Sequence, residues 1–282
     1  MTAIDKTINI GLNIHVREWA GEKPPFVLVH GLASNARLWD KVGDYLAAEG
    51  HRVIAIDQRG HGLSDKPDGG YDFETVTADL KKLLDTMELE RPYLAGQSWG
   101  GNVMLAFGVH YPAVARGLAF VDGGTIDIQA DPEATWEIIK ERMKPPSLIG
   151  LPRAEMRGYI QQGHPEWEEW AIEAILANFE TMPNSTIRPW LTLERHLKIL
   201  HELWLQRPPE LYPHVHEPVL IALADDGNAV WVERKKQQAQ AAAAGLPNAE
   251  IHWFHNTPHD IHVDKPEELA QLMLAHDKLS CT

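Results

Sequence analysis

The chain has 282 residues, of which 44% are hydrophobic and 23% charged, and its formal net charge is -14 at pH 7. This composition is typical of a globular chain with a sizeable core, and the acidic balance disfavours phosphate backbones and anionic membrane surfaces as partners. We therefore expect no nucleic-acid partner and no membrane partner.

The amino-terminal sequence and the single cysteine bear on where the protein is located in the cell and on its cysteine chemistry. The opening MTAIDKTINIGLNIHV lacks a basic segment followed by an apolar run, and no apolar stretch is long enough to cross a bilayer. The single cysteine is Cys281, which excludes an internal disulfide or a thiolate metal site. These features predict a cytoplasmic protein.

Short apolar runs alternate with helix-like segments in the first part of the chain. Residues 8–19 alternate enough to form an antiparallel edge pair. Apolar runs without polar alternation, separated by helices, are typical of parallel strands covered on both faces, which is a doubly wound α/β pattern. The expected strands are 25–31, 52–57, 92–96 and 117–122, and the expected helices are 35–50, 73–89 and 101–110.

The pattern changes between Thr125 and Pro213, where no strand-like run occurs and prolines separate helical stretches. Strand character resumes at 218–224 and 250–254, with a long helix between them and a last helix from Pro266. We predict a core domain of residues 1–124 and 214–282, interrupted by an all-helical insertion over 125–213. The expected helices of the insertion are 132–143, 153–161, 166–179 and 191–205.

The stretch LAGQSWGGN at 94–102 places Ser98 between an apolar strand and an apolar helix. A sharp strand-to-helix turn strains its central residue and crowds the positions two residues away on either side, which here are Gly96 and Gly100. This pattern predicts that the Ser98 hydroxyl projects above the sheet edge as a nucleophile.

A serine hydroxyl needs a base, and the base needs an acid that orients it. His259 lies in the loop after the last predicted strand, which brings its imidazole to the carboxyl edge of the sheet. Asp226, after the strand 218–224, is the preferred acid because it lies further into its loop than Asp225. Asp122, at the end of the strand 117–122, is the alternative acid, and Asp225 is the third choice.

Acyl transfer also requires donors for the developing oxyanion. The backbone N–H of Trp99, at the start of the helix after Ser98, is one candidate, and the N–H of Leu32 after His30 is the other. His30 is expected to shape this loop. Asp57, Arg59 and His61, in the stretch DQRGHGLS, are expected to form a buried polar brace.

Four motifs, HGLASNARLW, DQRGHGLSDKP, GQSWGG and PHDIHVDKPEE, occur in an order and spacing that resemble the α/β-hydrolase fold superfamily, specifically its small serine hydrolases with a helical cap. The resemblance implies a mostly parallel eight-stranded sheet, Ser98 as nucleophile, His259 as base and Leu32 with Trp99 as oxyanion hole. It implies no cofactor and no metal.

Two departures from the family pattern bear on the acid. Pro258 precedes His259 where the family usually has glycine, and the stretch LADDGNAVW matches the usual acid loop only with a shift. Asp122 therefore stays open, since haloalkane dehalogenases of this fold take their acid from the earlier strand. Those enzymes and epoxide hydrolases use an aspartate nucleophile, which Ser98 argues against.

The preferred activity is hydrolysis of carboxylic esters with small to medium apolar groups, through an acyl-enzyme. A proline iminopeptidase-like activity is an alternative, because tryptophan after the nucleophile is frequent there and Glu166, Glu168, Glu169 and Glu173 offer carboxylates for an amino terminus. Lactonase and carbon–carbon bond hydrolase activities are further alternatives. A non-catalytic ligand receptor on the same fold is the alternative from another class.

Overall fold

The computed structural model describes residues 2–280, so Cys281 lies outside the described residues. Within that range an eight-stranded sheet has the order β1-β2-β4-β3-β5-β6-β9-β10. β1 pairs antiparallel with β2, β2 pairs antiparallel with β4, and the other neighbours are parallel. The predicted doubly wound, mostly parallel sheet is confirmed. Its strands are β1 Ile4–Asn9, β2 Asn13–Trp19, β3 Lys23–Val29, β4 His51–Ile56, β5 Tyr93–Gln97, β6 Gly117–Val121, β9 Val219–Asp225 and β10 Ala249–His255.

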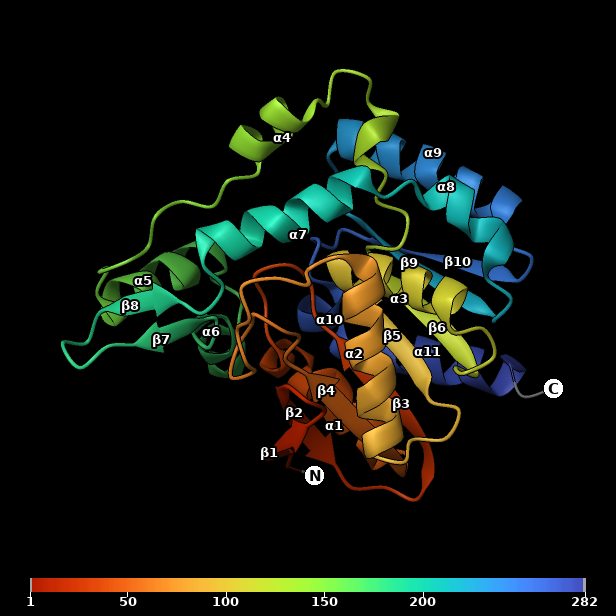
Figure 1. The fold of residues 1–282 in the computed structure, drawn as a ribbon, viewed down its shortest axis with the longest axis horizontal. Helices are drawn as coiled ribbons and strands as arrows, with labels where there is room; N and C mark the ends of the chain where they lie inside the picture. Colours follow the sequence, from red (N-terminus) through yellow and green to blue (C-terminus); the bar gives the residue numbers. More distant parts are fainter. Residues whose placement is uncertain (1, 281–282) are drawn as a thin grey trace.

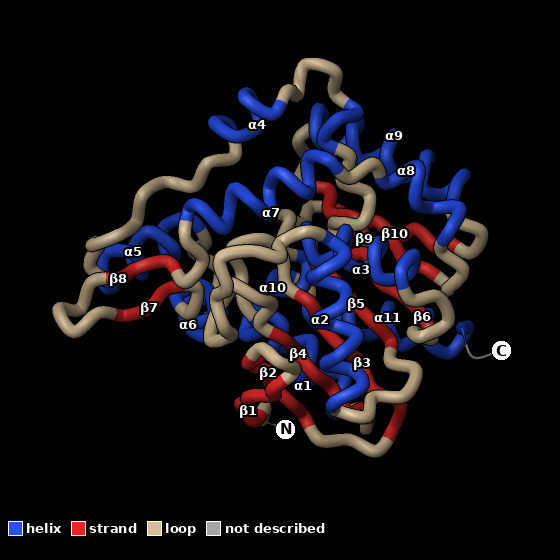
Figure 2. The backbone as a smooth tube through the Cα atoms, in the orientation of Figure 1, coloured by secondary structure: helices blue, strands red, loops and turns tan. Residues whose placement is uncertain are grey.

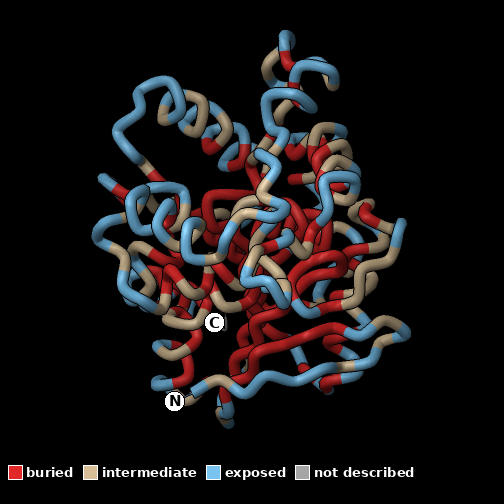
Figure 3. Tube along the Cα trace, turned by 90° about the vertical axis from the view of Figure 1, so that its left-hand side faces the viewer, coloured by how far each residue is buried: buried red, intermediate tan, exposed pale blue. Residues whose placement is uncertain are grey.

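Both faces of the central strands are buried, because successive side chains of a strand point to opposite faces. In β3, Val27 and Val29 belong to one apolar core, while Phe26 and Leu28 belong to the core on the other face. β5, β6 and β9 alternate between the same two cores. Figure 3 shows the buried segments gathered in the middle of the molecule and the exposed ones around them.

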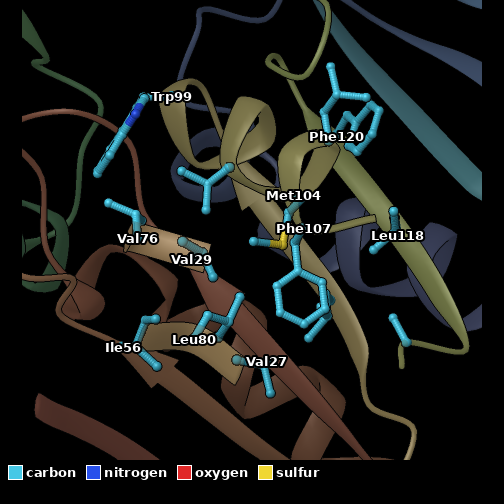
Figure 4. Packing of buried hydrophobic residues seen from close by; sticks show 14 of the residues in the cluster. Val27, Val29, Ile56, Val76, Leu80, Trp99, Met104, Phe107, Leu118 and Phe120 are labelled. Atoms are coloured by element: carbon cyan, nitrogen blue, oxygen red, sulfur yellow. The ribbon is translucent and has the colours of Figure 1, made fainter. Parts of the chain in front are cut away.

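Helices cover each face of the sheet (Figures 1 and 2). α2 (Phe73–Thr86), α3 (Trp99–His110) and α9 (Ala229–Gly245) contribute to the first core, and α1 (Asp40–Ala48) and α11 (Pro266–Ser280) contribute to the second. α3 contacts α2, β5 and β6, and Figure 4 shows its Met104 and Phe107 among side chains of β3, α2 and β6. None of the helices formed by residues 2–280 combines the length and apolar character needed to span a membrane.

The segment between β6 and β9 forms helices above one end of the sheet (Figure 1). It is not all-helical, which corrects the sequence prediction: β7 and β8 form an antiparallel pair joined by a turn in which Ser185 has a φ of 62°. Strands of three residues are too short to show alternation in a sequence. The division into a core of 1–124 and 214–282 and a cap of 125–213 stays a prediction. The elements of this segment are α4 Trp136–Arg142, α5 Arg153–Gly163, α6 Glu169–Leu176, β7 Phe179–Thr181, β8 Ile187–Pro189, α7 Leu193–Leu205 and α8 Pro208–Leu211.

Two buried asparagines tie this segment to the core at the carboxyl end of the parallel strands. The Asn35 amide donates to the carbonyl of Ala174 at 2.8 Å and to Asn178 Oδ1 at 2.6 Å. The Asn102 amide, one helical turn after Ser98, donates to Gln206 Oε1 at 2.7 Å and to the carbonyl of Ile126 at 3.0 Å. The inserted segment is therefore hydrogen-bonded to the loop after β3 and to α3, the helix that follows Ser98.

Candidate active site

Ser98 occupies a sharp turn between β5 and α3. Its φ of 54° and ψ of -122° place a non-glycine residue in a strained region of backbone space. The Ser98 N–H donates to the carbonyl of Val121 at 2.9 Å, and the Ser98 carbonyl accepts from the N–H of Gly101 at 2.9 Å. The strained strand-to-helix turn expected from the glycine spacing is therefore confirmed.

Close backbone contacts explain the glycines around Ser98. A β-carbon at Gly96 would lie 2.1 Å from the carbonyl oxygen of Gly100, and one at Gly100 would lie 2.6 Å from the carbonyl oxygen of His30. At Gly123, after β6, a β-carbon would lie 2.0 Å from the Ser98 carbonyl oxygen. The turn can approach β3 and β6 this closely only without side chains at these positions.

Replacing Gly96 with alanine is expected to lower the free energy of unfolding by about 3 kcal/mol, because the added methyl group meets fixed backbone. Gly158→Ala in α5 is the matched control, since a β-carbon there has no neighbour within 4 Å. The control should gain up to about 1 kcal/mol from the higher helix propensity of alanine. Urea denaturation of both variants measures the difference, and equal stability of the two would contradict this description of the turn.

The acidic partner of His259 is Asp122, the alternative acid in the sequence prediction. His259 Nδ1 donates to Asp122 Oδ2 at 2.6 Å, and only 1% of the Asp122 side chain is exposed. Asp122 follows β6 directly, with a φ of 43°. The Asp122 N–H donates to the carbonyl of Ala222 in β9 at 2.7 Å, and Asp122 Oδ1 accepts from the N–H of Ala224 at 3.0 Å.

Among the described residues Asp226 forms no hydrogen bond or ion pair with His259, whose Nδ1 is taken by Asp122, so the structure contradicts the preference for Asp226. Its Oδ1 accepts from the N–H of Asn228 at 2.9 Å, which holds the carboxylate in a local turn on the surface. Asp225, the third choice, accepts from His255 Nδ1 at 2.9 Å. An aspartate side chain that accepts a hydrogen bond from the backbone N–H two residues later is turned away from the sheet edge. The position of an aspartate at the end of a strand does not by itself reveal this local turn.

One residue beside Asp122 was missed by the sequence analysis. Lys235, on α9, donates from Nζ to Asp122 Oδ2 at 2.7 Å and to the carbonyl of Ala224 at 2.8 Å. Burial by itself would raise the pKa of the Asp122 carboxyl, but hydrogen bonds and charge from His259 and Lys235 outweigh burial and lower that pKa. Nothing in the polar stretch VERKKQQAQ singles out this lysine.

The loop of His259 lies against the turn that carries Ser98. The side-chain amide of Gln97 is 3.4 Å from the carbonyl of His259 and 3.4 Å from Asp260 Oδ1. The His259 side chain is 50% exposed. Within residues 2–280 no hydrogen bond joins Ser98 Oγ to the imidazole, and in unliganded enzymes such a contact often forms only when the substrate binds.

Burial lowers the pKa of His259, but the hydrogen bond and charge of Asp122, with the charge of Asp260, raise it by more. The pKa of His259 therefore lies above the ordinary value of 6.5.

In the ester hydrolysis expected from the sequence, His259 acts as the base in its neutral form, so kcat/KM is expected to rise with pH through a midpoint above 6.5. The measurement is the pH profile of kcat/KM for p-nitrophenyl butyrate with a buffer-only blank at each pH. A midpoint at or below the ordinary histidine value would contradict the pairing of His259 with Asp122.

The loop that follows β3 lies beside Ser98. A β-carbon at Gly31 would lie 3.0 Å from the Ser98 β-carbon, which brings the next residue, Leu32, close to Ser98. Trp99 begins α3, where first-turn N–H groups have no acceptor within the helix. Among residues 2–280 the Leu32 N–H forms no backbone hydrogen bond.

Buried histidines hold this loop, as predicted for His30. His30 Nε2 accepts from the Gln58 N–H at 3.0 Å, and its Nδ1 donates to the Gly31 carbonyl at 2.7 Å. His61 Nε2 accepts from the N–H of Ala33 at 3.2 Å. Burial lowers the pKa of both His30 and His61, so both rings are neutral supports of the loop.

The expected brace around Asp57 forms with partners from other elements. Asp57 accepts from His15 Nδ1 at 2.8 Å and from the N–H of Ala36 at 2.8 Å. Burial would raise the pKa of Asp57, but these and neighbouring donors lower it to about 2. Arg59 pairs with Asp79 at 2.6 Å rather than with Asp57.

The inserted segment presents apolar side chains to Leu32. Leu32 packs against a cluster formed by the start of the segment, α4 and α7, whose members are Ile128, Ala134, Trp136, Ile139, Leu197, Leu200 and Trp204. Other tryptophans of the segment attach it to the core. Trp167 donates from Nε1 to Asp264 Oδ1 at 2.8 Å, and Lys66 lies 4.6 Å from the ring centre of Trp190.

Two of the four carboxylates considered for an amino-terminal substrate group, Glu169 and Glu173, are paired with arginines of the segment. Arg157 binds both Glu169 and Glu173, and Arg153 binds Glu173 at 2.5 Å. Among residues 2–280, His, Cys, Asp and Glu side chains form no group of three or more that could hold a metal ion.

A protein-family model described as the alpha/beta hydrolase family matches residues 26–272. The chain belongs to the alpha/beta hydrolase family. The resemblance of the sequence motifs to the α/β-hydrolase superfamily is confirmed. The order of the strands and the turn at Ser98 are the framework in which this family carries its reactive groups.

Relatives of this alpha/beta hydrolase differ in how much of the chain they match. An uncharacterised protein of Mycobacterium bovis is 35% identical over 107 residues, which are 38% of this chain and only 31% of that protein. A 2-hydroxy-6-oxononadienedioate/2-hydroxy-6-oxononatrienedioate hydrolase of Paraburkholderia phymatum is 25% identical over 273 residues, covering 93% of this chain and 90% of the relative. Among solved structures, E-2-(acetamidomethylene)succinate hydrolase superposes with a TM-score of 0.83 at 22% identity, covering 98% of this chain and 99% of that one.

Proposed function

We propose that this alpha/beta hydrolase cleaves carboxylic esters with small to medium apolar groups through an acyl-enzyme on Ser98. The proposed triad is Ser98, His259 and Asp122, with the backbone N–H groups of Leu32 and Trp99 as the oxyanion hole. The observation that carries the proposal is the His259–Asp122 hydrogen bond of 2.6 Å, at the same sheet edge as the strained turn of Ser98.

The proposed reaction follows from the hydrogen-bonding capacity of each group. The Asp122 carboxylate accepts from His259 Nδ1–H, which leaves Nε2 as an acceptor that takes the Ser98 proton while Oγ attacks the ester carbonyl. The two N–H groups bind the resulting oxyanion. His259 then returns the proton to the leaving alcohol, and a water molecule, deprotonated in the same way, releases the carboxylic acid and restores Ser98.

The expected preference for apolar groups rests on the environment of Leu32. The inserted segment covers the Leu32 side chain with aliphatic and tryptophan side chains, so a substrate chain there would leave water for an apolar surface. Glu169 and Glu173, two of the four glutamates considered for an amino terminus, are bound by Arg153 and Arg157. A free amino group would have to break these pairs to use them, which disfavours the iminopeptidase alternative.

A carbon–carbon bond hydrolase is the second candidate. Its support is the relative from Paraburkholderia phymatum, named as a hydrolase of 2-hydroxy-6-oxo dienedioates, which this chain matches over 93% of its length. The same serine, histidine and oxyanion donors would serve a carbonyl group attached to carbon instead of oxygen.

A substrate panel tests these candidates. p-Nitrophenyl acetate, butyrate and octanoate are compared with proline p-nitroanilide and a 2-hydroxy-6-oxo-dienedioate, each with Ser98→Ala as the blank. Turnover of the esters, highest for butyrate or octanoate, is expected. Turnover of the dienedioate or of the proline substrate alone would overturn the esterase proposal, and inertness toward all of them would favour a receptor on this fold.

A further inference from the structure

Lys235 reaches the Asp122 carboxylate from α9, more than one hundred residues along the chain. Its Nζ lies 2.7 Å from Asp122 Oδ2, the same oxygen that His259 Nδ1 reaches at 2.6 Å. The Lys235 side chain is 21% exposed and that of Asp122 is 1% exposed. One buried carboxylate oxygen therefore holds an ammonium and an imidazole together.

The second contact of Lys235 ties the ammonium to the sheet. Nζ also donates to the carbonyl of Ala224 at 2.8 Å, and the N–H of the same residue donates to Asp122 Oδ1 at 3.0 Å. Ala224 lies in β9, beside β6, so the ammonium, the carboxylate and one peptide group form a closed set of contacts. The orientation of the Asp122 carboxylate is fixed on both oxygens.

We propose that Lys235 is a positioning residue of the triad. It orients Asp122 and competes with His259 for the negative charge of the Asp122 carboxylate, and so sets the pH range in which His259 acts as a base. This inference rests on the proposed function. A carboxylate that already binds an ammonium has less negative potential to offer an imidazolium, so the lysine weakens the stabilisation of protonated His259.

The charges around His259 give the direction of the effect. Within the described residues, Asp122 after β6 and Asp260 in the His259 loop favour the protonated ring, whereas Lys235 from α9 opposes it and lowers its pKa. His262, in α10 (Ile261–Asp264), also faces His259, but burial lowers its pKa to about 4 and keeps it neutral. Removing the charge at position 235 therefore raises the pKa of His259.

The test compares Lys235→Met and Lys235→Arg with the control Lys236→Met, the next residue of α9, which is exposed. Lys235→Met is expected to lower kcat for p-nitrophenyl butyrate about tenfold and to shift the acid limb of kcat/KM to higher pH. Lys235→Arg keeps the charge and should leave that limb close to its wild-type position, as should Lys236→Met. If Lys235→Met does not fold, Lys235→Gln replaces it with the same expectations.

A second readout keeps this inference separate from the proposed function. NMR titration of the His259 imidazole, assigned by its loss in His259→Asn, needs no activity and should show the same shift in Lys235→Met. Loss of activity with an unshifted limb and an unshifted His259 titration would overturn the inference, because a purely structural lysine predicts that result. An equal shift in Lys235→Arg would also overturn it. An enzyme inert toward esters in which His259 still shifts would overturn only the proposed function.

Discussion

Ser98→Ala is expected to lower kcat for p-nitrophenyl butyrate by about 10^5–10^6-fold, leaving only the rate that substrate binding and the oxyanion hole supply. The reason is chemical, because alanine keeps the β-carbon and removes the oxygen proposed to attack the ester. The measurement is kcat and KM of purified wild type and variant at a pH above the midpoint of the profile.

The fold should survive this substitution. Ser98 Oγ makes no hydrogen bond to His259, and alanine can keep the strained φ of 54° that serine already has. The thermal unfolding midpoint should therefore change little, and KM should stay within a few-fold. A variant that keeps most of the wild-type kcat would contradict the role of Ser98, whereas loss of activity through unfolding would appear as a lowered midpoint.

Asp122→Asn is expected to lower kcat by about 10^4-fold. The asparagine amide cannot stabilise the imidazolium, and its NH2 group can turn toward Nδ1 and stabilise the wrong tautomer of His259. It also leaves Lys235 without its counter-charge. The measurement is kcat for the same ester at several pH values, so that a shifted profile is not mistaken for a lost rate.

Asp226→Asn is the matched control, since it makes the same change one strand away on an exposed carboxylate. Its kcat should stay within a few-fold of the wild type, because asparagine can still accept from the Asn228 N–H. The reverse result, a large loss of kcat in Asp226→Asn with a small loss in Asp122→Asn, would show that the triad acid is Asp226, in the loop after β9.

The sequence was sufficient for the fold wherever local pattern and burial agree. Runs such as PFVLVHG and PVLIALA lie on strands buried on both faces, and the glycines around Ser98 mark the turn because backbone contact leaves no alternative. The observed strand boundaries differ from the predicted ones where the hydrophobic pattern is weak. The first edge pair begins at Ile4 rather than at residue 8, because exposed strands carry few apolar residues.

The acid could not be chosen from the sequence. β6 and β9 are parallel neighbours, so Asp122 and Asp226 both follow strands that end at the same edge of the sheet. Two contacts distinguish these aspartates. The Asp226 carboxylate accepts from the N–H of Asn228 in a local turn, whereas the Asp122 carboxylate is held by the long-range contact with Lys235. A residue on a polar helix carries no sequence signal for such a contact.

Covalent labelling of the nucleophile tests the central claim most directly. The intact chain is treated with a serine-reactive organophosphorus fluoride and examined by mass spectrometry and peptide mapping, with Ser98→Ala and His259→Ala treated in parallel. We expect one adduct per wild-type chain, on the peptide that contains Ser98, appearing in step with loss of ester hydrolysis and slowed strongly in His259→Ala. An ester-hydrolysing chain that forms no adduct, or forms it on another residue, would contradict this expectation.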